Sequence, residues 1–164
     1  QGKIEVIEFF WYGCIHCYKL EPALEAWLTK LPADVEYIRV PAVFNDRWAH
    51  DAAIYYAFGA LGLVEKLHRP LFDAIHRDRL RTDNGEALGE WLKKQGADAK
   101  KVAEAMASFG VRSKVRRAAQ RSLAYRIGGT PAMAVHGRYT VSADQGRSHQ
   151  GMLLTVDHLV GLVR

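Results

Sequence analysis

The hydrophobic pattern first becomes clear at residues 3–10, "KIEVIEFF". β-Branched and aromatic residues dominate this stretch, which has neither glycine nor proline, as is typical of a β-strand. Its apolar side chains fall on both faces, so we expect a central strand that is buried on both sides. One carboxylate, Glu8, lies inside this apolar run.

After Gly13 the pattern changes to a helical one, and the next apolar residues suit a helix with one apolar stripe. These residues are Ile15, Leu20, Leu24, Trp27, Leu28 and Leu31. Pro22 lies inside this helix and should kink it, because proline cannot donate a backbone hydrogen bond. A second strand is predicted at residues 35–40, "VEYIRV".

From about residue 44 to residue 128 the pattern predicts helices almost throughout. One apolar stripe in this region is interrupted at Pro70. Asp83 and Glu86 resemble a capping box at the start of a further helix. The last and longest helix is predicted over residues 111–126.

Composition indicates an ordinary globular protein, with 164 residues, of which 49% are hydrophobic and 25% charged. This length suits one compact domain or a domain that carries a large insertion. No apolar run approaches the ~20 residues that a membrane-spanning helix needs. The chain begins directly in a predicted strand, as it would after removal of a signal peptide or after trimming of the sequence, so the start is compatible with a secreted protein whose signal peptide has been removed.

The formal net charge is +5, and basic residues concentrate in "VRSKVRRAAQRSLAYR", residues 111–126. A nucleic-acid-binding surface would combine a basic stripe with several aromatic residues. This segment has one aromatic residue, Tyr125, and its basic residues surround most of a helix. We therefore interpret it as a solvated helix face and expect no nucleic-acid partner.

The chain has two cysteines, Cys14 and Cys17, separated by Ile15 and His16. A zinc site usually takes four ligands from paired motifs, and this chain has no second Cys-x-x-Cys pair and only scattered histidines. A disulfide across so short a loop would also add little stability. A redox couple is the interpretation that remains best supported, although a metal-binding module that uses Cys14, Cys17 and His16 stays as a distant alternative.

The predicted strand and helix around the pair suit redox chemistry. Cys14 falls at the helix N-terminus, where free backbone N–H groups and the helix dipole stabilise a thiolate. The thiolate is the nucleophile of disulfide exchange, and His16 adds a donor or a positive charge beside it. Cys17 lies nearly one turn further along the same face, from where it can attack a mixed disulfide at Cys14.

Residues 10–22, "FWYGCIHCYKLEP", resemble the active-site segment of the thioredoxin superfamily, and in particular of the DsbA family of periplasmic thiol oxidants. The DsbA pattern has a histidine directly before the second cysteine, as His16 is here. Its commonest central dipeptide is Pro-His, and Ile15 replaces that proline. We expect this change to alter the shape of the substrate groove more than the thiolate chemistry.

A second segment, "GGTPAMAVHGRY" at residues 128–139, is similar to the cis-proline loop of the same superfamily. The resemblance implies that Pro131 is the cis residue and that the loop packs against the Cys-x-x-Cys helix. It also implies that Thr130 offers its backbone N–H and C=O to an incoming extended peptide. Two short strands are predicted after it, at residues 132–135 and 139–141.

The resemblance covers nearly the whole chain and implies an α/β protein, a thioredoxin fold with an inserted all-helical domain. Residues 1–45 and 114–164 would form the thioredoxin-like domain, and residues 46–113 the insertion. In DsbA-like proteins an acid lies beneath the second cysteine, and Glu8 and Arg39 match that acid and its basic partner. We favour Glu8 as a proton relay for Cys17, with a purely structural Glu8–Arg39 ion pair as the alternative.

The function that the resemblance implies is donation of the Cys14–Cys17 disulfide to reduced, unfolded secreted proteins in the periplasm. It implies no cofactor or metal beyond that disulfide, a monomer, and a DsbB-type membrane oxidase that regenerates the enzyme. The substrate groove is expected near Trp11, Ile15, Thr130 and Pro131. The nearer alternative is a disulfide isomerase or reductase on the same fold, with which Thr130 is compatible, although isomerases usually carry a dimerisation domain that this chain lacks.

Overall fold

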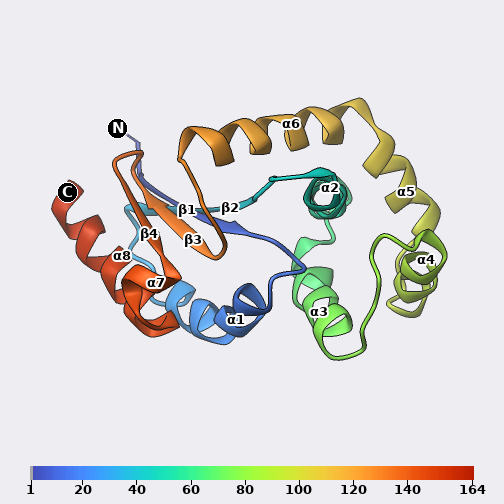
Figure 1. Ribbon diagram of the computed structural model, residues 1–164, viewed down its shortest axis with the longest axis horizontal. Helices are drawn as coiled ribbons and strands as arrows, with labels where there is room; N and C mark the ends of the chain where they lie inside the picture. Colours follow the sequence, from blue (N-terminus) through green and yellow to red (C-terminus); the bar gives the residue numbers. More distant parts are fainter. Residues whose placement is uncertain (1) are drawn as a thin grey trace.

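Four strands form one mixed sheet in the computed structural model, which describes residues 2–164 (Figure 1). The strands are β1 (Ile4–Phe10), β2 (Val35–Pro41), β3 (Ala132–Val135) and β4 (Tyr139–Ser142). They lie in the order β2-β1-β3-β4. β1 pairs parallel to β2 and antiparallel to β3, and β4 pairs antiparallel to β3. The predicted central strand is therefore β1, with a neighbour on each side.

Helices cover both faces of this sheet. On one face, α1 (Ile15–Leu28) and α8 (His149–Val163) contribute to a core that also contains Val6 of β1. On the other face, α2 (Asp46–Ala60) and α6 (Phe109–Ala124) pack over Ile7, Phe9 and Val40. The short helix α7 (Ala143–Gly146) leads from β4 to α8. The expectation that β1 is buried on both sides is thus confirmed.

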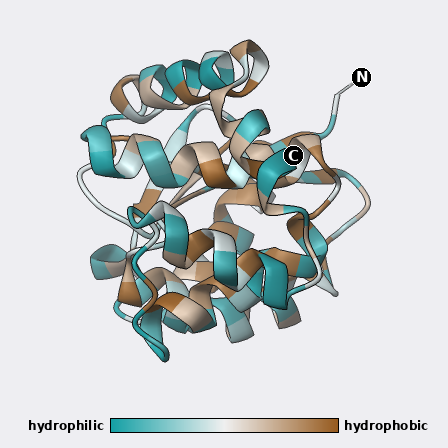
Figure 2. Ribbon diagram, turned by 90° about the vertical axis from the view of Figure 1, so that its right-hand side faces the viewer, coloured by the Kyte–Doolittle hydropathy of each residue, from teal (hydrophilic) through white to brown (hydrophobic). Residues whose placement is uncertain are grey.

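The chain between β2 and β3 is helical and forms a core of its own. Besides α2 and α6 it contains α3 (Val64–His76), α4 (Gly85–Lys94) and α5 (Ala99–Ala107). In Figure 2 these helices carry hydrophobic residues in brown beside hydrophilic residues in teal, as amphipathic helices do. Phe10, the last residue of β1, and Tyr12, two residues after it, are buried in this second core together with Phe58, Leu71 and Phe72. The segment that leads into the cysteine pair is therefore anchored in the helical insertion.

The division of the chain into domains at residue 46 and residue 113 remains a prediction. Helix α6 runs without a break through residues 113 and 114. It packs on the sheet through Ala118. At its N-terminus, α6 follows α5 directly, because Ser108 is both the C-cap of α5 and the N-cap of α6.

Two details of the sequence-based prediction are wrong. α3 is not interrupted at Pro70, because the proline removes only the bond to the carbonyl of Lys66, and buried Leu67 and Leu71 hold the helix in place. The N-cap of α4 is Asn84, whose side-chain oxygen accepts from the backbone N–H of Ala87 at 3.1 Å. The neighbouring carboxylate of Asp83 is instead engaged by two arginines, Arg47 and Arg81.

Candidate active site

Cys14 is the N-cap residue of α1, and its sulfur lies at the open end of the helix. The sulfur accepts a hydrogen bond from the backbone N–H of Cys17 at 3.4 Å. In the thiol form it donates to the backbone carbonyl oxygen of Thr130, also at 3.4 Å. The cysteine helix and the loop before β3 therefore meet at this sulfur, although they lie 116 positions apart in the chain.

The pKa of Cys14 is lowered to about 5. The largest cause is a hydrogen bond from the thiol of Cys17, which stabilises the Cys14 thiolate. Burial opposes this effect, and further hydrogen bonds from Thr130 and from the backbone of Cys17 and His16 support it. The sulfur of Cys14 is therefore largely ionised at neutral pH.

Cys17 has the opposite character. It is fully buried, and burial raises the pKa of its thiol well above the ordinary value. The hydrogen bond to Cys14, the charge of Cys14 and, as a smaller cause, the charge of Glu8 raise it further. The pair thus joins a half-buried thiolate to a buried thiol that retains its proton.

This asymmetry predicts the order of modification in the reduced protein. At about pH 6, limited treatment with iodoacetamide should label Cys14 and leave Cys17 unmodified, because the thiolate is the reactive form. Mass mapping of the peptides after brief treatment measures both sites. Protein unfolded in denaturant is the control and should be labelled at both sites alike. Equal labelling of the folded protein, or labelling of Cys17 first, would contradict the assignment.

The other predicted residues occupy different places around this pair. His16 is exposed on the first turn of α1, and its backbone N–H is the group that acts on Cys14. Ile15 is 40% exposed at the start of the helix. The peptide bond between Thr130 and Pro131 is cis. Beside it lies a cavity of about 910 Å³ that His16, Thr130 and Pro131 line but Trp11 and Ile15 do not.

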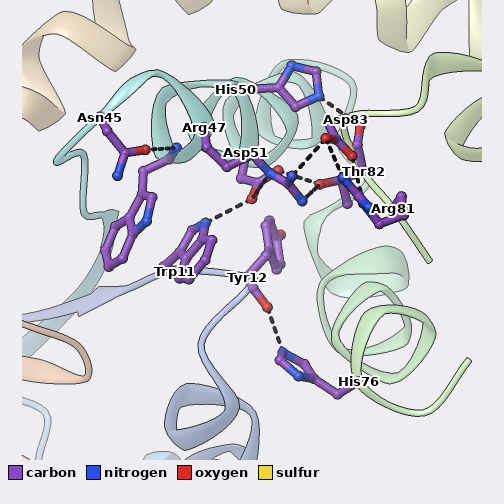
Figure 3. Close-up of polar contacts among 11 residues, drawn as sticks. Trp11, Tyr12, Asn45, Arg47, His50, Asp51, His76, Arg81, Thr82 and Asp83 are labelled. Atoms are coloured by element: carbon purple, nitrogen blue, oxygen red, sulfur yellow. Dashed lines mark hydrogen bonds and ion pairs between the residues drawn. The ribbon is translucent and has the colours of Figure 1, made fainter. Parts of the chain in front are cut away.

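Trp11 lies instead against the helical insertion (Figure 3). Its indole N–H donates to Oδ2 of Asp51 at 2.8 Å, and its ring stacks on Trp48 of α2 with the ring centres 4.3 Å apart. A Cβ atom on Gly13 would lie only 2.3 Å from the Trp11 ring, so glycine is required here for the ring to keep this position. The structure therefore places Trp11 beside the cysteine segment but outside the cavity next to Pro131.

Asp51, which the sequence analysis did not identify, holds this arrangement from the buried face of α2. Besides Trp11, it accepts a hydrogen bond from the hydroxyl of Thr82 at 2.6 Å, and Nε of Arg47 lies 3.6 Å away. Arg47 also bonds Thr82 and forms an ion pair with Asp83 at 2.9 Å. Figure 3 shows these groups converging on Asp51. Asp51 could have been found from the sequence, because it is a charged residue on the apolar side of α2.

Glu8 is fully buried and lies opposite Arg39 in the β1–β2 register. Its Oε1 atom lies 3.5 Å from Nε of Arg39 and accepts a hydrogen bond from the hydroxyl of Tyr37. Its Oε2 atom has no hydrogen-bond partner among residues 2–164. Burial and the nearby charge of Glu21 raise the pKa of Glu8, and they outweigh the opposing effects of Arg39 and Tyr37.

Glu21 and His68 extend this buried polar group and were also missed. Oε1 of Glu21 lies 3.7 Å from Nε2 of His68, and Nδ1 of His68 forms a 2.8 Å hydrogen bond with the hydroxyl of Tyr12. Burial lowers the pKa of His68 to about 3, so the ring is neutral at physiological pH. Glu21 could have been found from the sequence, because it falls one turn after Cys17, on the buried face of α1.

Residues 2–164 contain neither a metal-binding cluster nor a membrane-spanning helix. No three histidine, cysteine, aspartate or glutamate side chains lie close enough together to hold a metal ion in this part of the chain. Within the same residues, no helix combines the length and the apolar character that a membrane span requires.

Known proteins share both this fold and this sequence. The family profile of the DSBA-like thioredoxin domain matches residues 35–150. The thiol:disulfide interchange protein DsbA of Azotobacter vinelandii is 39% identical over 159 residues, 97% of this chain and 74% of that protein. The chain belongs to the DsbA family. A second DsbA, from Bordetella pertussis, is 42% identical over 160 residues, 97% of this chain and 76% of its own length.

Solved structures of DsbA proteins agree with the fold. The crystal structure of Pseudomonas aeruginosa DsbA superposes with a TM-score of 0.94 at 33% identity, over 99% of this chain and 85% of that chain. DsbA from Xylella fastidiosa gives a TM-score of 0.91 at 32% identity, over 99% and 87% of the two chains. The predicted thioredoxin fold with a helical insertion is confirmed, and so is the prediction of a thiol-disulfide oxidoreductase. Cys14 and Cys17 form the Cys-x-x-Cys pair of this DsbA-family chain.

Proposed function

We propose that this DsbA-family protein is an oxidant, which donates a Cys14–Cys17 disulfide to reduced proteins as they fold in the periplasm. The lowered pKa of Cys14 is the observation that carries the proposal. A thiolate that the folded protein stabilises is a good leaving group, and its stabilisation favours the reduced form of the pair. The disulfide therefore readily gives way to the dithiol, as an oxidant requires.

The chemistry proceeds in two exchanges. A substrate thiolate attacks the sulfur of Cys14, the bond between the two enzyme sulfurs breaks, and its electron pair leaves on Cys17. Cys17 then takes up a proton, as its raised pKa favours. A second substrate thiolate attacks the substrate sulfur of the mixed disulfide and releases Cys14 as a thiolate. The substrate has lost two electrons, and the enzyme pair has gained them.

The cavity beside Pro131 suits the substrate chain in these steps. Thr130 lies at the Cys14 sulfur and has backbone groups that an extended peptide can bond in the manner of strand addition. The two glycines before it, Gly128 and Gly129, have open space where a side chain would begin, so a neighbouring chain can approach the backbone. We assign substrate binding in this cavity to Thr130 and Pro131, with His16 at the rim. Ile15 and Trp11, which lie outside the cavity, are proposed to contact the substrate chain beyond it.

The redox cycle needs a partner that reoxidises the enzyme and a compartment that suits disulfide formation. A disulfide donor must be reoxidised after each turnover, and the Cys14 thiolate would attack a disulfide of a DsbB-type membrane oxidase to form a mixed disulfide. Attack of Cys17 on the Cys14 sulfur would then restore the enzyme disulfide and release the oxidase as a thiolate. An oxidising compartment such as the periplasm suits this cycle, because newly formed disulfides persist there. We also propose that residues 46–113 act as a domain of their own that shapes one side of the site through Asp51 and Trp48.

A redox titration tests the direction of the reaction. Equilibration of the Cys14–Cys17 pair with glutathione buffers should give a potential well above the ~−270 mV that is typical of a reducing thioredoxin. In a fluorescent dithiol-peptide assay, C14S should abolish oxidation, and C17S incubated with the disulfide form of the peptide should accumulate a mixed disulfide at Cys14. A potential near that of thioredoxin would instead indicate a reductase on the same fold.

Glu8 is proposed to exchange a proton with Cys17 when Cys17 attacks a mixed disulfide. Burial raises the pKa of the Glu8 carboxyl above its usual value, which favours the protonated form, and its Oε2 atom has no hydrogen-bond partner among residues 2–164. We expect Glu8→Gln to slow the escape of a Cys14 mixed disulfide through Cys17 by about 10-fold, with a changed pH profile, since a positioned proton carrier contributes at least this much.

Stopped-flow measurement of mixed-disulfide decay over a range of pH values tests this role. Glu5→Gln is the matched control, because Glu5 is on the same strand but half-buried and paired with Arg121 at 3.7 Å. The alkylation pKa of Cys14 should stay nearly constant in both variants. Unaltered decay kinetics in Glu8→Gln would leave Glu8 only its structural pairing with Arg39.

A further inference from the structure

Helix α6 carries a concentration of positive charge that the redox chemistry does not use. Its sixteen residues, "FGVRSKVRRAAQRSLA", contain four arginines, one lysine and no acidic residue. The formal charge of this one helix is thus +5, equal to the formal net charge of the whole chain. The rest of the protein is balanced, so any anionic surface would meet its strongest attraction at α6.

The same helix exposes the two most accessible large apolar side chains among residues 2–164. Phe109 is 79% exposed and Leu123 is 80% exposed. At about 100° per residue, they fall on the same side of the helix as Arg112 and Arg116. The buried residues of α6 lie on the opposite side and comprise Val111, Ala118 and Ser122. We call Phe109, Arg112, Arg116 and Leu123 the outer face of α6.

The charges of α6 are largely available to a partner. Arg121 forms an ion pair with Glu5, whereas Arg112, Lys114, Arg116 and Arg117 have no acidic partner among residues 2–164. The guanidinium of Arg116 lies 5.9 Å from the ring centre of Phe109, so cation and aromatic ring form one surface.

We propose that the outer face of α6 docks the protein on an anionic phospholipid membrane. A surface helix binds the membrane interface when basic side chains meet anionic headgroups and apolar side chains enter the headgroup region. Phe109 and Leu123 supply that apolar contact at the two ends of the helix, and the arginines between them supply the charge. The outer face of α6 on a second copy of the chain would carry the same positive charge and would be repelled. Binding of a nucleic acid would not account for the exposed apolar side chain of Leu123.

Docking in this way leaves the redox site free. α6 and α1 cover opposite faces of the sheet, and in Figure 1 they lie on opposite edges of the molecule. Cys14, at the start of α1, would therefore remain accessible to protein substrates at the membrane surface. This inference goes beyond the proposed oxidation of substrates and does not depend on the direction of the redox reaction.

Vesicle sedimentation of the whole chain tests the proposal. The protein should bind vesicles that contain phosphatidylglycerol, fail to bind pure phosphatidylcholine vesicles, and be released by added salt. R112Q/R116Q should lower the partition coefficient about 25-fold, since one basic residue near such a surface contributes ~1 kcal/mol, or about 5-fold. F109S/L123S should also lower binding.

Two matched controls separate the outer face from general properties of the chain. K93Q/K94Q removes the same charge from exposed positions of α4, and L154S removes an apolar side chain that is 68% exposed on α8. Both should bind vesicles nearly as wild type does, and all variants should keep their oxidation of a dithiol peptide. The proposal fails if phosphatidylglycerol vesicles are not bound, or if K93Q/K94Q weakens binding as much as R112Q/R116Q. It also fails if a single-stranded oligonucleotide binds more tightly than the vesicles do and F109S/L123S has no effect on either.

Discussion

Asp51→Ala is expected to lower the free energy of unfolding by about 3 kcal/mol, the usual cost of breaking a buried charged network. Asp51 is 1% exposed and accepts hydrogen bonds from Trp11 and Thr82. Its removal leaves the indole N–H and the hydroxyl without an acceptor, and it leaves the Arg47 guanidinium without its buried counter-charge. For a chain of this size, the melting temperature should fall by roughly 6–12 °C.

Asp83→Ala provides the control within the same group of residues (Figure 3). Asp83 also pairs with Arg47 and Arg81, but it is exposed to solvent, where an ion pair contributes at most about 1 kcal/mol. Chemical denaturation of the two variants and the wild-type protein measures the difference. An Asp83→Ala variant that is destabilised as much as Asp51→Ala would show that Asp51 has no special role in joining the insertion to Trp11.

Reduced protein is expected to be more stable than oxidised protein at pH 7. The pKa of Cys14 is about 5 in the folded protein and about 8.5 in an unfolded chain, so folding stabilises the thiolate. At pH 7 this difference corresponds to ~2.7 kcal/mol, and solvent screening of the half-buried sulfur reduces it to about 1–2 kcal/mol. The disulfide itself stabilises the oxidised form only slightly, because closing so short a loop removes little entropy from the unfolded chain.

The sign of this effect fixes its dependence on pH. A lowered folded-state pKa gives a stabilisation that is complete above the unfolded pKa and disappears as pH falls through about 5. Urea melts of reduced and oxidised protein should therefore differ clearly at pH 7 and converge near pH 4. An oxidised form that is the more stable at pH 7 would exclude a strong oxidant and favour a thioredoxin-like reductase.

The sequence was sufficient for features that depend on local pattern. The run of β-branched and aromatic residues in β1 and the helical stripe after Gly13 correctly predicted the strand and the helix. The spacing of Cys14 and Cys17 correctly predicted the position of the Cys14 sulfur at the helix end. The resemblance of the loop around Pro131 then placed a second, distant segment at the same site, and the contact between Cys14 and Thr130 agrees with it.

Contacts between residues that lie far apart in the chain could not be predicted from local sequence patterns. Asp51 binds Trp11 across 40 positions and Thr82 across 31, and no local rule links these residues. The cap of α4 shows the same limit. Asp83 and Asn84 are equally good capping residues by type, and the choice depends on Arg47, which comes from another helix and engages Asp83.

The contact between Cys14 and Thr130 has a consequence for biosynthesis. The two residues are 116 positions apart, so a chain that emerges N-terminus first during synthesis presents both cysteines long before the loop that completes their site. Such long-range contacts form late, because the cost of closing the intervening loop precedes the gain from the contact. A half-emerged chain has the nucleophile and its helix but lacks Thr130 and the cavity beside Pro131. The enzyme would therefore acquire its mature reactivity only when nearly the whole chain has emerged.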